Sequence, residues 1–184
     1  MELPAYQPEK LTQLIHELAV TRGDFTLASG AKASFYLDCR QLTLHPQGLV
    51  QVAAGMVSLL QQEALPDAVG GMAIGADPIT AGIIHHAGLA GLQLQGFIVR
   101  KEAKGHGTGR QVEGPVKAGQ KIVIVEDVVT SGGSSLKAIQ AVRDFGLEVT
   151  RVLAIVDRQA GGREAFQSAG VSFDSLFTLS DLGL

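Results

Sequence analysis

The stretch from residue 121 to residue 135 constrains the fold of this 184-residue chain more than any other; it reads KIVIVEDVVTSGGSS. Its apolar, β-branched beginning predicts a buried strand that ends at Glu126, and a second carboxylate, Asp127, follows directly. Two glycines and four hydroxyl side chains then lead into a helical pattern. A strand, a glycine-rich turn and a helix N-terminus in succession are typical of an α/β protein, whose ligands bind at such turns.

From residue 46 onward, segments with the apolar spacing of helices alternate with apolar segments typical of strands. Helices are predicted over 46–63, 79–87, 134–145 and 163–169, and strands over 69–74, 93–99, 121–126, 148–156 and 171–179. Several of the strand segments are continuously apolar, as in parallel strands that are covered on both faces. The pattern therefore predicts an α/β fold with a mainly parallel central sheet flanked by helices. The sequence contains no linker or internal repeat, so we expect one domain over residues 1–184.

The N-terminal part is less regular. An i, i+3, i+4, i+7 spacing predicts an amphipathic helix from Pro8 to Arg22, with Gly23 as its stop; the apolar positions are Leu11, Leu14, Ile15 and Leu18. A turn at Ser29-Gly30 and a short strand over 34–38 are predicted to follow. Further along, residues 75–78 (GADP) are expected to form a turn between a strand and a helix.

Composition limits the classes of protein and partner. Hydrophobic residues make up 46% of the chain and charged residues 18%, which predicts a folded core. The net charge of −3 gives no basic signal for nucleic acid or for an anionic membrane. Cys39 is the only cysteine, which excludes an intrachain disulfide and fits a reducing compartment. Because the start is polar and no apolar run approaches the roughly 20 residues of a membrane span, we expect a cytoplasmic protein.

The glycine-rich turn after the strand is suited to phosphate, because free backbone N–H groups and the helix dipole favour an anion there. Neighbouring carboxylates could hold hydroxyl groups or a metal ion. The sequence has no GxxxxGK[ST] loop, and the glycines at 105, 107 and 109 do not have the spacing of a dinucleotide fingerprint. A purely structural alternative makes the carboxylates a solvated strand end and the hydroxyls helix caps. Two adjacent carboxylates, four hydroxyls and two glycines exceed what capping requires.

Residues 100–110, RKEAKGHGTGR, form a second candidate segment with four cationic side chains and one histidine. Standing alone, it could equally be a solvated surface hairpin. Beside a phosphate-binding turn, a glycine-rich cationic loop could close over a pyrophosphate and exclude water.

The motif VIVEDVVTSGGSS resembles the phosphoribosyl pyrophosphate (PRPP) motif of the type I phosphoribosyltransferases. The resemblance implies that family's fold, with a small hood from roughly residues 1–45 plus C-terminal contributions and a core over 46–184. It also implies that Glu126 and Asp127 contact the ribose hydroxyls, with Asp127 a catalytic residue. The loop that would wrap the 5-phosphate of PRPP comprises Val128, Val129, Thr130, Ser131, Gly132, Gly133 and Ser134.

The RKEAKxHG segment resembles the catalytic loop of the orotate phosphoribosyltransferases within that family. This resemblance implies a homodimer with shared active sites, in which Lys104 is catalytic and the pyrophosphate is bound by Arg100, Lys101, Lys104 and His106. Residues 25–40 resemble the hood segment, and SLFTLSDL near the C-terminus resembles the end of the same family. Arg158, just past a strand end, would contact orotate together with Thr130; the alternative for Arg158 is a surface arginine.

The resemblance covers nearly the whole chain and implies a reaction. The expected activity transfers ribose 5-phosphate from PRPP to orotate, giving orotidine 5'-monophosphate and pyrophosphate in UMP biosynthesis. Mg²⁺ is expected mainly on PRPP and pyrophosphate oxygens, without a direct protein ligand. Two alternatives are a phosphoribosyltransferase for another base, such as a purine, and a non-catalytic regulator that binds a nucleotide or RNA. The chain departs from many family members at Ala28 and Gly75, where those proteins have lysine.

Overall fold

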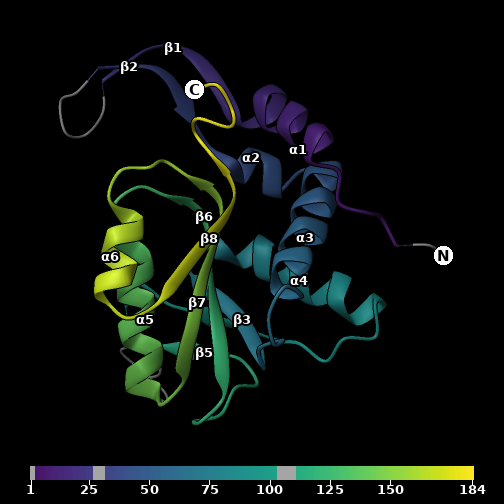
Figure 1. Cartoon of the computed structure of the whole chain (residues 1–184), viewed down its shortest axis with the longest axis vertical. Helices are drawn as coiled ribbons and strands as arrows, with labels where there is room; N and C mark the ends of the chain where they lie inside the picture. The colour runs from purple at the N-terminus through teal and green to yellow at the C-terminus, as the bar shows by residue number, and fades with distance from the viewer. Residues whose placement is uncertain (1–2, 27–31, 103–110) are drawn as a thin grey trace.

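The computed structural model describes residues 3–26, 32–102 and 111–184, and its centre is a six-stranded sheet with the order β5–β4–β3–β6–β7–β8 (Figure 1). The strands are β3 (Ala68–Met72), β4 (Gln95–Val99), β5 (Val112–Glu113), β6 (Lys121–Val129), β7 (Glu148–Asp157) and β8 (Ser172–Thr178). All neighbouring pairs are parallel except β4 with β5. The mainly parallel sheet predicted from the sequence is therefore confirmed.

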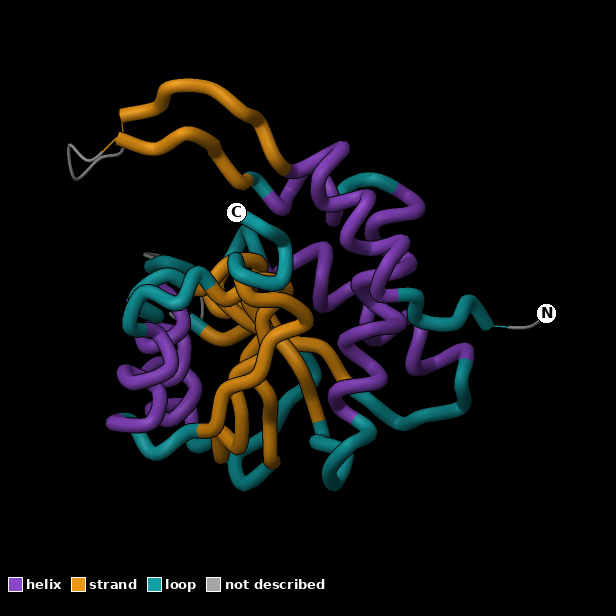
Figure 2. Tube along the Cα trace, turned by 45° about the horizontal axis from the view of Figure 1, so that its top comes forward, coloured by secondary structure: helices purple, strands orange, loops and turns teal. Residues whose placement is uncertain are grey.

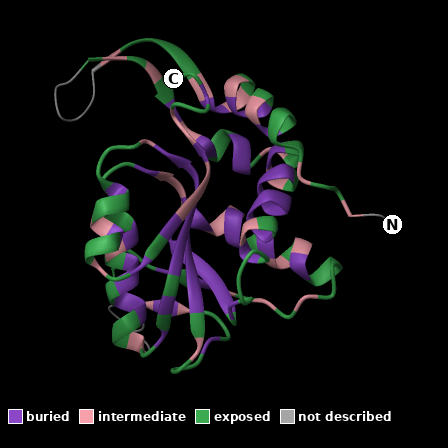
Figure 3. Ribbon diagram, viewed as in Figure 1, coloured by how far each residue is buried: buried purple, intermediate pink, exposed green. Residues whose placement is uncertain are grey.

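Helices cover both faces of this sheet. The helices α3 (Pro46–Leu60) and α4 (Ala76–Leu89) lie on one face, and α5 (Gly133–Phe145) and α6 (Gly162–Ser168) lie on the other (Figure 1). Each face has its own buried apolar cluster; Met56 and Ile79 belong to the first, and Ile139 and Phe166 to the second. Figure 3 shows the central strands buried between these layers. In the described part of the chain, no helix has the length and apolarity needed to cross a membrane.

The N-terminal part lies at one end of the sheet and shares the apolar cluster of α3 and α4. It consists of α1 (Pro8–Leu14), the π-helical turn η1 (Ile15–Ala19), α2 (Cys39–Thr43) and the antiparallel hairpin of β1 (Val20–Thr26) and β2 (Lys32–Leu37). The hairpin stands away from the central sheet (Figure 2), and most of its residues are exposed or intermediate (Figure 3). The C-terminus lies beside the base of the hairpin (Figure 1).

The prediction of a helix from Pro8 to Arg22 was wrong at the C-terminal end of the helix. The helical segment stops at Ala19, and Val20, Thr21 and Arg22 pair with Leu37, Tyr36 and Phe35 in the register of β1 and β2. Gly23 therefore lies inside a strand and does not end a helix. The reason is that cross-strand pairing with a distant segment overrides the local apolar spacing. The predicted turn at Ser29-Gly30 lies outside the described residues.

Two boundaries at the ligand edge of the sheet also differ from the prediction. The strand predicted to end at Glu126 continues to Val129, because Val128 and Val129 pair with Val156 and Asp157 of β7. The helix predicted to begin at residue 79 begins at Ala76, since a proline in the first helical turn loses no hydrogen bond. The short elements α2 and β5 were not predicted.

The order of the strands creates a switch point. From β3 the chain crosses to β4 on one side and then returns to β6 on the other. The carboxyl ends of β3 and β6 therefore lie side by side with their following segments diverging. In open parallel sheets this crevice is where ligands bind, and here it brings residues 73–75 next to residues 126–128.

Candidate active site

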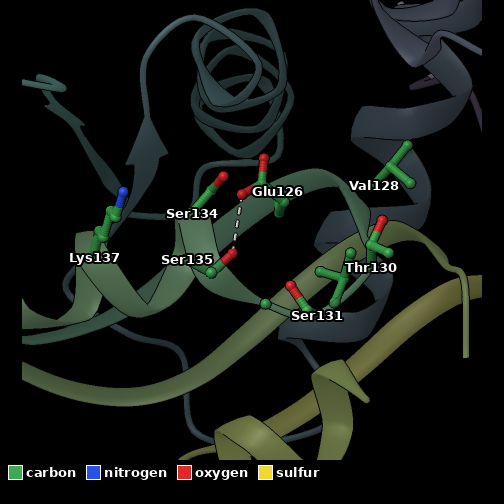
Figure 4. Close-up of a pocket in the computed structure, with 10 residues that line it drawn as sticks. Glu126, Val128, Thr130, Ser131, Ser134, Ser135 and Lys137 are labelled. Atoms are coloured by element: carbon green, nitrogen blue, oxygen red, sulfur yellow. Dashed lines mark hydrogen bonds between the residues drawn. The ribbon is translucent and has the colours of Figure 1, made fainter. Parts of the chain in front are cut away.

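The turn from β6 into α5 encloses a cavity of about 340 Å³, which we call the loop cavity (Figure 4). Its lining residues are Glu126, Val128, Val129, Thr130, Ser131, Gly132, Gly133, Ser134, Ser135 and Lys137. The first-turn N–H groups of α5 have no carbonyl partner within the helix, so they can bind an anion. Gly132 has φ 79°, and a Cβ at this position would lie 2.9 Å from the Phe166 ring, so the turn requires glycine.

A second cavity of about 380 Å³, the switch-point cavity, adjoins the first. Its lining residues are Tyr36, Leu37, Asp38, Arg40, Met72, Ala73, Ile74, Gly75, Lys101, Glu126, Asp127, Val128, Thr130, Ser134 and Arg158. Glu126, Val128, Thr130 and Ser134 line both cavities. One extended ligand could therefore place an anionic end in the loop cavity and its remainder between the two strand ends.

Glu126 lies at the junction of the two cavities and is 7% exposed. The hydroxyl of Ser135 donates a hydrogen bond of 3.0 Å to its Oε2 atom (Figure 4). Burial, together with the neighbouring negative charge of Asp127, raises the pKa of Glu126 to about 7. This carboxyl can therefore gain or lose a proton near neutral pH.

Asp127 follows Glu126 directly and lines the switch-point cavity together with it. The backbone N–H of Val128 donates to Asp127 Oδ1 at 2.9 Å, which fixes the orientation of the carboxylate. A Cβ atom at Gly75 would lie 3.2 Å from the same oxygen. A side chain at this position would crowd the Asp127 carboxylate, so the close approach favours glycine.

Two arginines also line the switch-point cavity. Arg40 forms a bidentate pair with Asp38, at 2.8 Å to Oδ1 and 3.0 Å to Oδ2, and this hydrogen bonding lowers the pKa of Asp38. Arg158 is half-buried, and its Nε has no hydrogen-bond partner among the described residues. A guanidinium with an unused buried donor is suited to a planar carboxylate or carbonyl group of a ligand.

The described start of the cationic segment, residues 100–102, lies at the edge of this cavity. The backbone N–H of Arg100 donates to the Gln111 carbonyl at 2.9 Å, and the Gln111 side-chain amide donates to the Arg100 carbonyl at 3.0 Å. These two bonds join the residues on either side of 103–110. Lys101 lines the switch-point cavity, and Arg100 lines a neighbouring hollow of about 630 Å³. Lys104 and His106 lie outside the described residues, as does Ala28.

Comparison with known proteins places the chain in a family. The phosphoribosyl transferase domain family matches residues 39–173. An orotate phosphoribosyltransferase from Rhodopirellula baltica is 58% identical over 179 residues, which cover 95% of this chain and 93% of the relative. The chain belongs to the orotate phosphoribosyltransferase family.

Solved structures of this family have the same fold. The Mycobacterium tuberculosis H37Rv orotate phosphoribosyltransferase matches with a TM-score of 0.87 and 39% identity, over 96% of this chain and 99% of that protein. A structure of the M. tuberculosis enzyme in complex with PRPP matches with a TM-score of 0.83 and 36% identity, again over 96% and 99% of the two chains. The resemblance inferred from the PRPP motif and the cationic loop is thereby confirmed.

Within this family framework, the structure brings most of the predicted site residues together. Residues 126–134 line one or both cavities, and Lys101 and Arg158 face them from other elements. Val129 is 1% exposed and packs in the core, so only its backbone could meet a ligand. No role was predicted for Ser135 or Lys137, since nothing in their spacing separates them from ordinary residues near the start of a helix. The described residues contain no cluster of three or more potential metal-ligating side chains.

The raised pKa of Glu126 predicts a pH-dependent penalty to stability. When the pKa of a carboxyl is higher in the folded than in the unfolded state, its protonated form favours folding. This contribution to stability is complete below the pKa of the unfolded state and is lost as the pH rises through about 7. Glu126→Gln removes the buried charge and keeps an acceptor for Ser135. We expect the variant to be more stable than the wild type at pH 8, by on the order of 1 kcal/mol, and nearly equal at pH 4. Thermal unfolding at the two pH values measures this difference; a gain of equal size at both would contradict it.

Proposed function

We propose that this chain catalyses the transfer of ribose 5-phosphate from PRPP to orotate, which gives orotidine 5'-monophosphate and pyrophosphate and serves UMP biosynthesis. The observation that carries this proposal is the position of the carboxylates at the junction of two contiguous cavities. Glu126 lines both cavities: the loop cavity, which lies at the N-terminus of α5, and the switch-point cavity, which Arg158 also lines. A phosphate, a ribose and an acidic base can be accommodated in that order.

The donor side follows from the loop cavity. The first-turn amides of α5 and the surrounding hydroxyls would bind the 5-phosphate, because both donate to a dianion. The carboxylates of Glu126 and Asp127 would accept hydrogen bonds from the ribose hydroxyls. The proposed PRPP contacts are Arg100, Lys101, Lys104, His106, Glu126, Asp127, Val128, Val129, Thr130, Ser131, Gly132, Gly133 and Ser134.

The acceptor side requires orientation more than acid–base chemistry. Orotate is already anionic, so a strong general base is not needed when its ring nitrogen bonds to the anomeric carbon and the carbon–pyrophosphate bond breaks. Arg158 and Thr130 would hold the base in line, and the Asp127 carboxylate would favour the positive charge that develops on the ribose. Orientation of this kind can lower a barrier by roughly 7–11 kcal/mol. Cations of the loop, above all Lys104, would stabilise the departing pyrophosphate.

Mg²⁺ fits the chemistry of these donors. Carboxylate oxygens combined with substrate phosphate oxygens are the ligand set that Mg²⁺ usually adopts. Asp127 is half-buried and lines the switch-point cavity, so a hydrated cation could approach its carboxylate from the cavity while it is held mainly by PRPP oxygens. When bound, the cation would neutralise charge on the pyrophosphate.

We further infer a homodimer with shared active sites. Ile74 is 67% exposed and Ile98 37% exposed, and both line the hollow that adjoins the cationic segment. An apolar hollow over α4 and β4, lined in part by Ala81 and Ile84, lies next to it. Exposed apolar side chains of this size around a concave surface are suited to a partner subunit. A loop that starts at the edge of such a surface could contribute to the partner's site.

The remaining parts of the proposal concern organisation and location. We propose one domain over residues 1–184, with a hood of roughly residues 1–45 plus C-terminal contributions over a core of 46–184. We also propose a cytoplasmic location, which the single cysteine supports, and no nucleic-acid or membrane partner, in line with the net charge of −3.

A substrate panel tests the acceptor. Purified protein with PRPP and Mg²⁺ is supplied in turn with orotate, adenine, hypoxanthine and uracil, and pyrophosphate release is measured. Release with orotate alone is expected. Turnover only with a purine would establish the alternative phosphoribosyltransferase, and RNA binding with steep salt dependence but no pyrophosphate release would establish the regulator.

Arg158→Ala should weaken the binding of the acceptor, orotate, and leave the binding of the donor, PRPP, nearly unchanged. Loss of a charge-assisted contact to orotate is expected to raise the KM for orotate by roughly tenfold to a hundredfold, while the affinity for PRPP changes little. Steady-state kinetics with each substrate varied in turn measures both. Arg143→Ala on α5, an exposed arginine that donates to the Ala169 carbonyl far from the cavities, is the matched control. Equal losses for both substrates would contradict a specific role in binding the base.

A further inference from the structure

The hydrogen bond between Ser135 and Glu126 joins the two halves of the site. Ser135 belongs to the first turn of α5, which floors the loop cavity, and Glu126 belongs to β6 at the junction of the two cavities. Their contact is 3.0 Å long and both residues are buried, with exposures of 1% and 7%. Figure 4 shows the bond crossing from the helix to the strand.

This contact differs from ordinary capping of a helix. A serine in the first turn commonly bonds to a nearby backbone group of its own helix. Ser135 instead donates to a side chain nine residues earlier in the chain, on another element. Removing such a partner leaves a buried acceptor with unmet hydrogen-bonding capacity, which is costly for a charged group.

We propose that Ser135 is a positioning residue for Glu126, holding its carboxylate toward the ribose position and tying it to the helix N-terminus that would bind the 5-phosphate. The proposal rests on the proposed function for its ligand, PRPP. The Ser135 hydroxyl holds Oε2, and a carboxylate has acceptor capacity beyond one such bond with which to accept from a ribose hydroxyl. The bond also favours the charged form of a carboxyl that burial and Asp127 disfavour.

A double-mutant cycle with PRPP binding as the readout tests this role. Calorimetric titration of PRPP and Mg²⁺, without any base, is performed on the wild type, Ser135→Ala, Glu126→Gln and the double variant. Ser135→Ala is expected to weaken PRPP binding by about tenfold. In the Glu126→Gln background the same change is expected to cost less than about threefold, because the carboxylate that Ser135 holds is absent.

Two further variants separate positioning from packing. Ser135→Thr keeps the hydroxyl and should retain most of the affinity. Ser135→Cys keeps a side chain of similar size but donates a much weaker hydrogen bond. It replaces Ser135→Ala in the cycle if thermal unfolding shows that the Ser135→Ala variant does not fold. Ser168→Ala removes an exposed serine hydroxyl of α6 that donates to the Glu164 carbonyl and should leave PRPP binding unchanged.

The outcomes distinguish this inference from the proposed function. Wild-type affinity in Ser135→Ala, or an equal loss in the wild-type and Glu126→Gln backgrounds, overturns the role of Ser135. Because no base is present, a wild-type chain that binds PRPP but transfers its ribose to a base other than orotate contradicts only the proposed acceptor. A wild-type chain that does not bind PRPP contradicts both.

Discussion

Replacement of Asp127 by asparagine is expected to lower kcat by roughly a hundredfold to a thousandfold, the usual cost of removing one electrostatic group from a transition state. The carboxylate lies at the switch point between β3 and β6, and its charge would offset the positive charge that develops on the ribose as pyrophosphate leaves. Asparagine keeps an oxygen at the Oδ1 position, which accepts from the Val128 N–H at 2.9 Å in the wild type. The local backbone should therefore be preserved.

Pyrophosphate release under saturating orotate and PRPP measures the effect. The matched control is Asp144→Asn, which changes an exposed carboxylate on α5 that accepts from the Gln140 amide outside both cavities. That variant should retain the wild-type kcat. If Asp127→Asn turned over within a factor of about three of the wild type, well under the usual cost of losing such a group, the Asp127 carboxylate would have no part in the chemical step.

Replacement of Lys104 by alanine should lower kcat to a similar extent, roughly a hundredfold or more, because a loop cation would stabilise the departing pyrophosphate in a water-excluded site. Lys104 lies outside the described residues, and the support for its role is the RKEAKxHG segment and the paired bonds of Arg100 and Gln111 that flank it. The melting temperature should not change. Lys117→Ala, an exposed lysine away from the cavities, is the control and should keep full turnover.

Mixing the two inactive variants tests whether sites are shared. If the loop of one subunit completes the site of the other, a heterodimer of Lys104→Ala and Asp127→Asn contains one intact site of two. Random pairing of equal amounts would then restore about a quarter of wild-type activity. Heterodimers that form, as shown by mass spectrometry, but remain inactive would mean that each site is built from one chain.

The architecture of the core could be predicted because it depends on local patterns. The apolar runs of β6 and β7 are continuous, and the glycines at 132 and 146 mark the two ends of α5. The failures lie where distant segments decide the outcome. Val20 to Arg22 continue a helical spacing, yet they pair with β2. The strand predicted to end at Glu126 continues to Val129, because Val128 and Val129 pair with β7.

In the site, too, features set by local sequence could be predicted and features set by contacts between distant segments could not. The motif around Glu126 and Asp127 could be located from sequence because a strand, two carboxylates and a glycine turn follow one another directly. The contact from Ser135 could not, since it depends on the angle at which α5 leaves the strand. Nor could the close approach of Gly75 to the Asp127 carboxylate, which depends on the pairing of β3 with β6.

The most direct test of the proposed reaction is the consumption of orotate, followed by its absorbance, in a mixture of the purified protein, PRPP and Mg²⁺. We expect orotate to be consumed with one equivalent of pyrophosphate released, and the rate to collapse when Mg²⁺ is chelated. A stable orotate signal in the complete mixture, from protein that unfolds cooperatively and binds PRPP, would contradict the account.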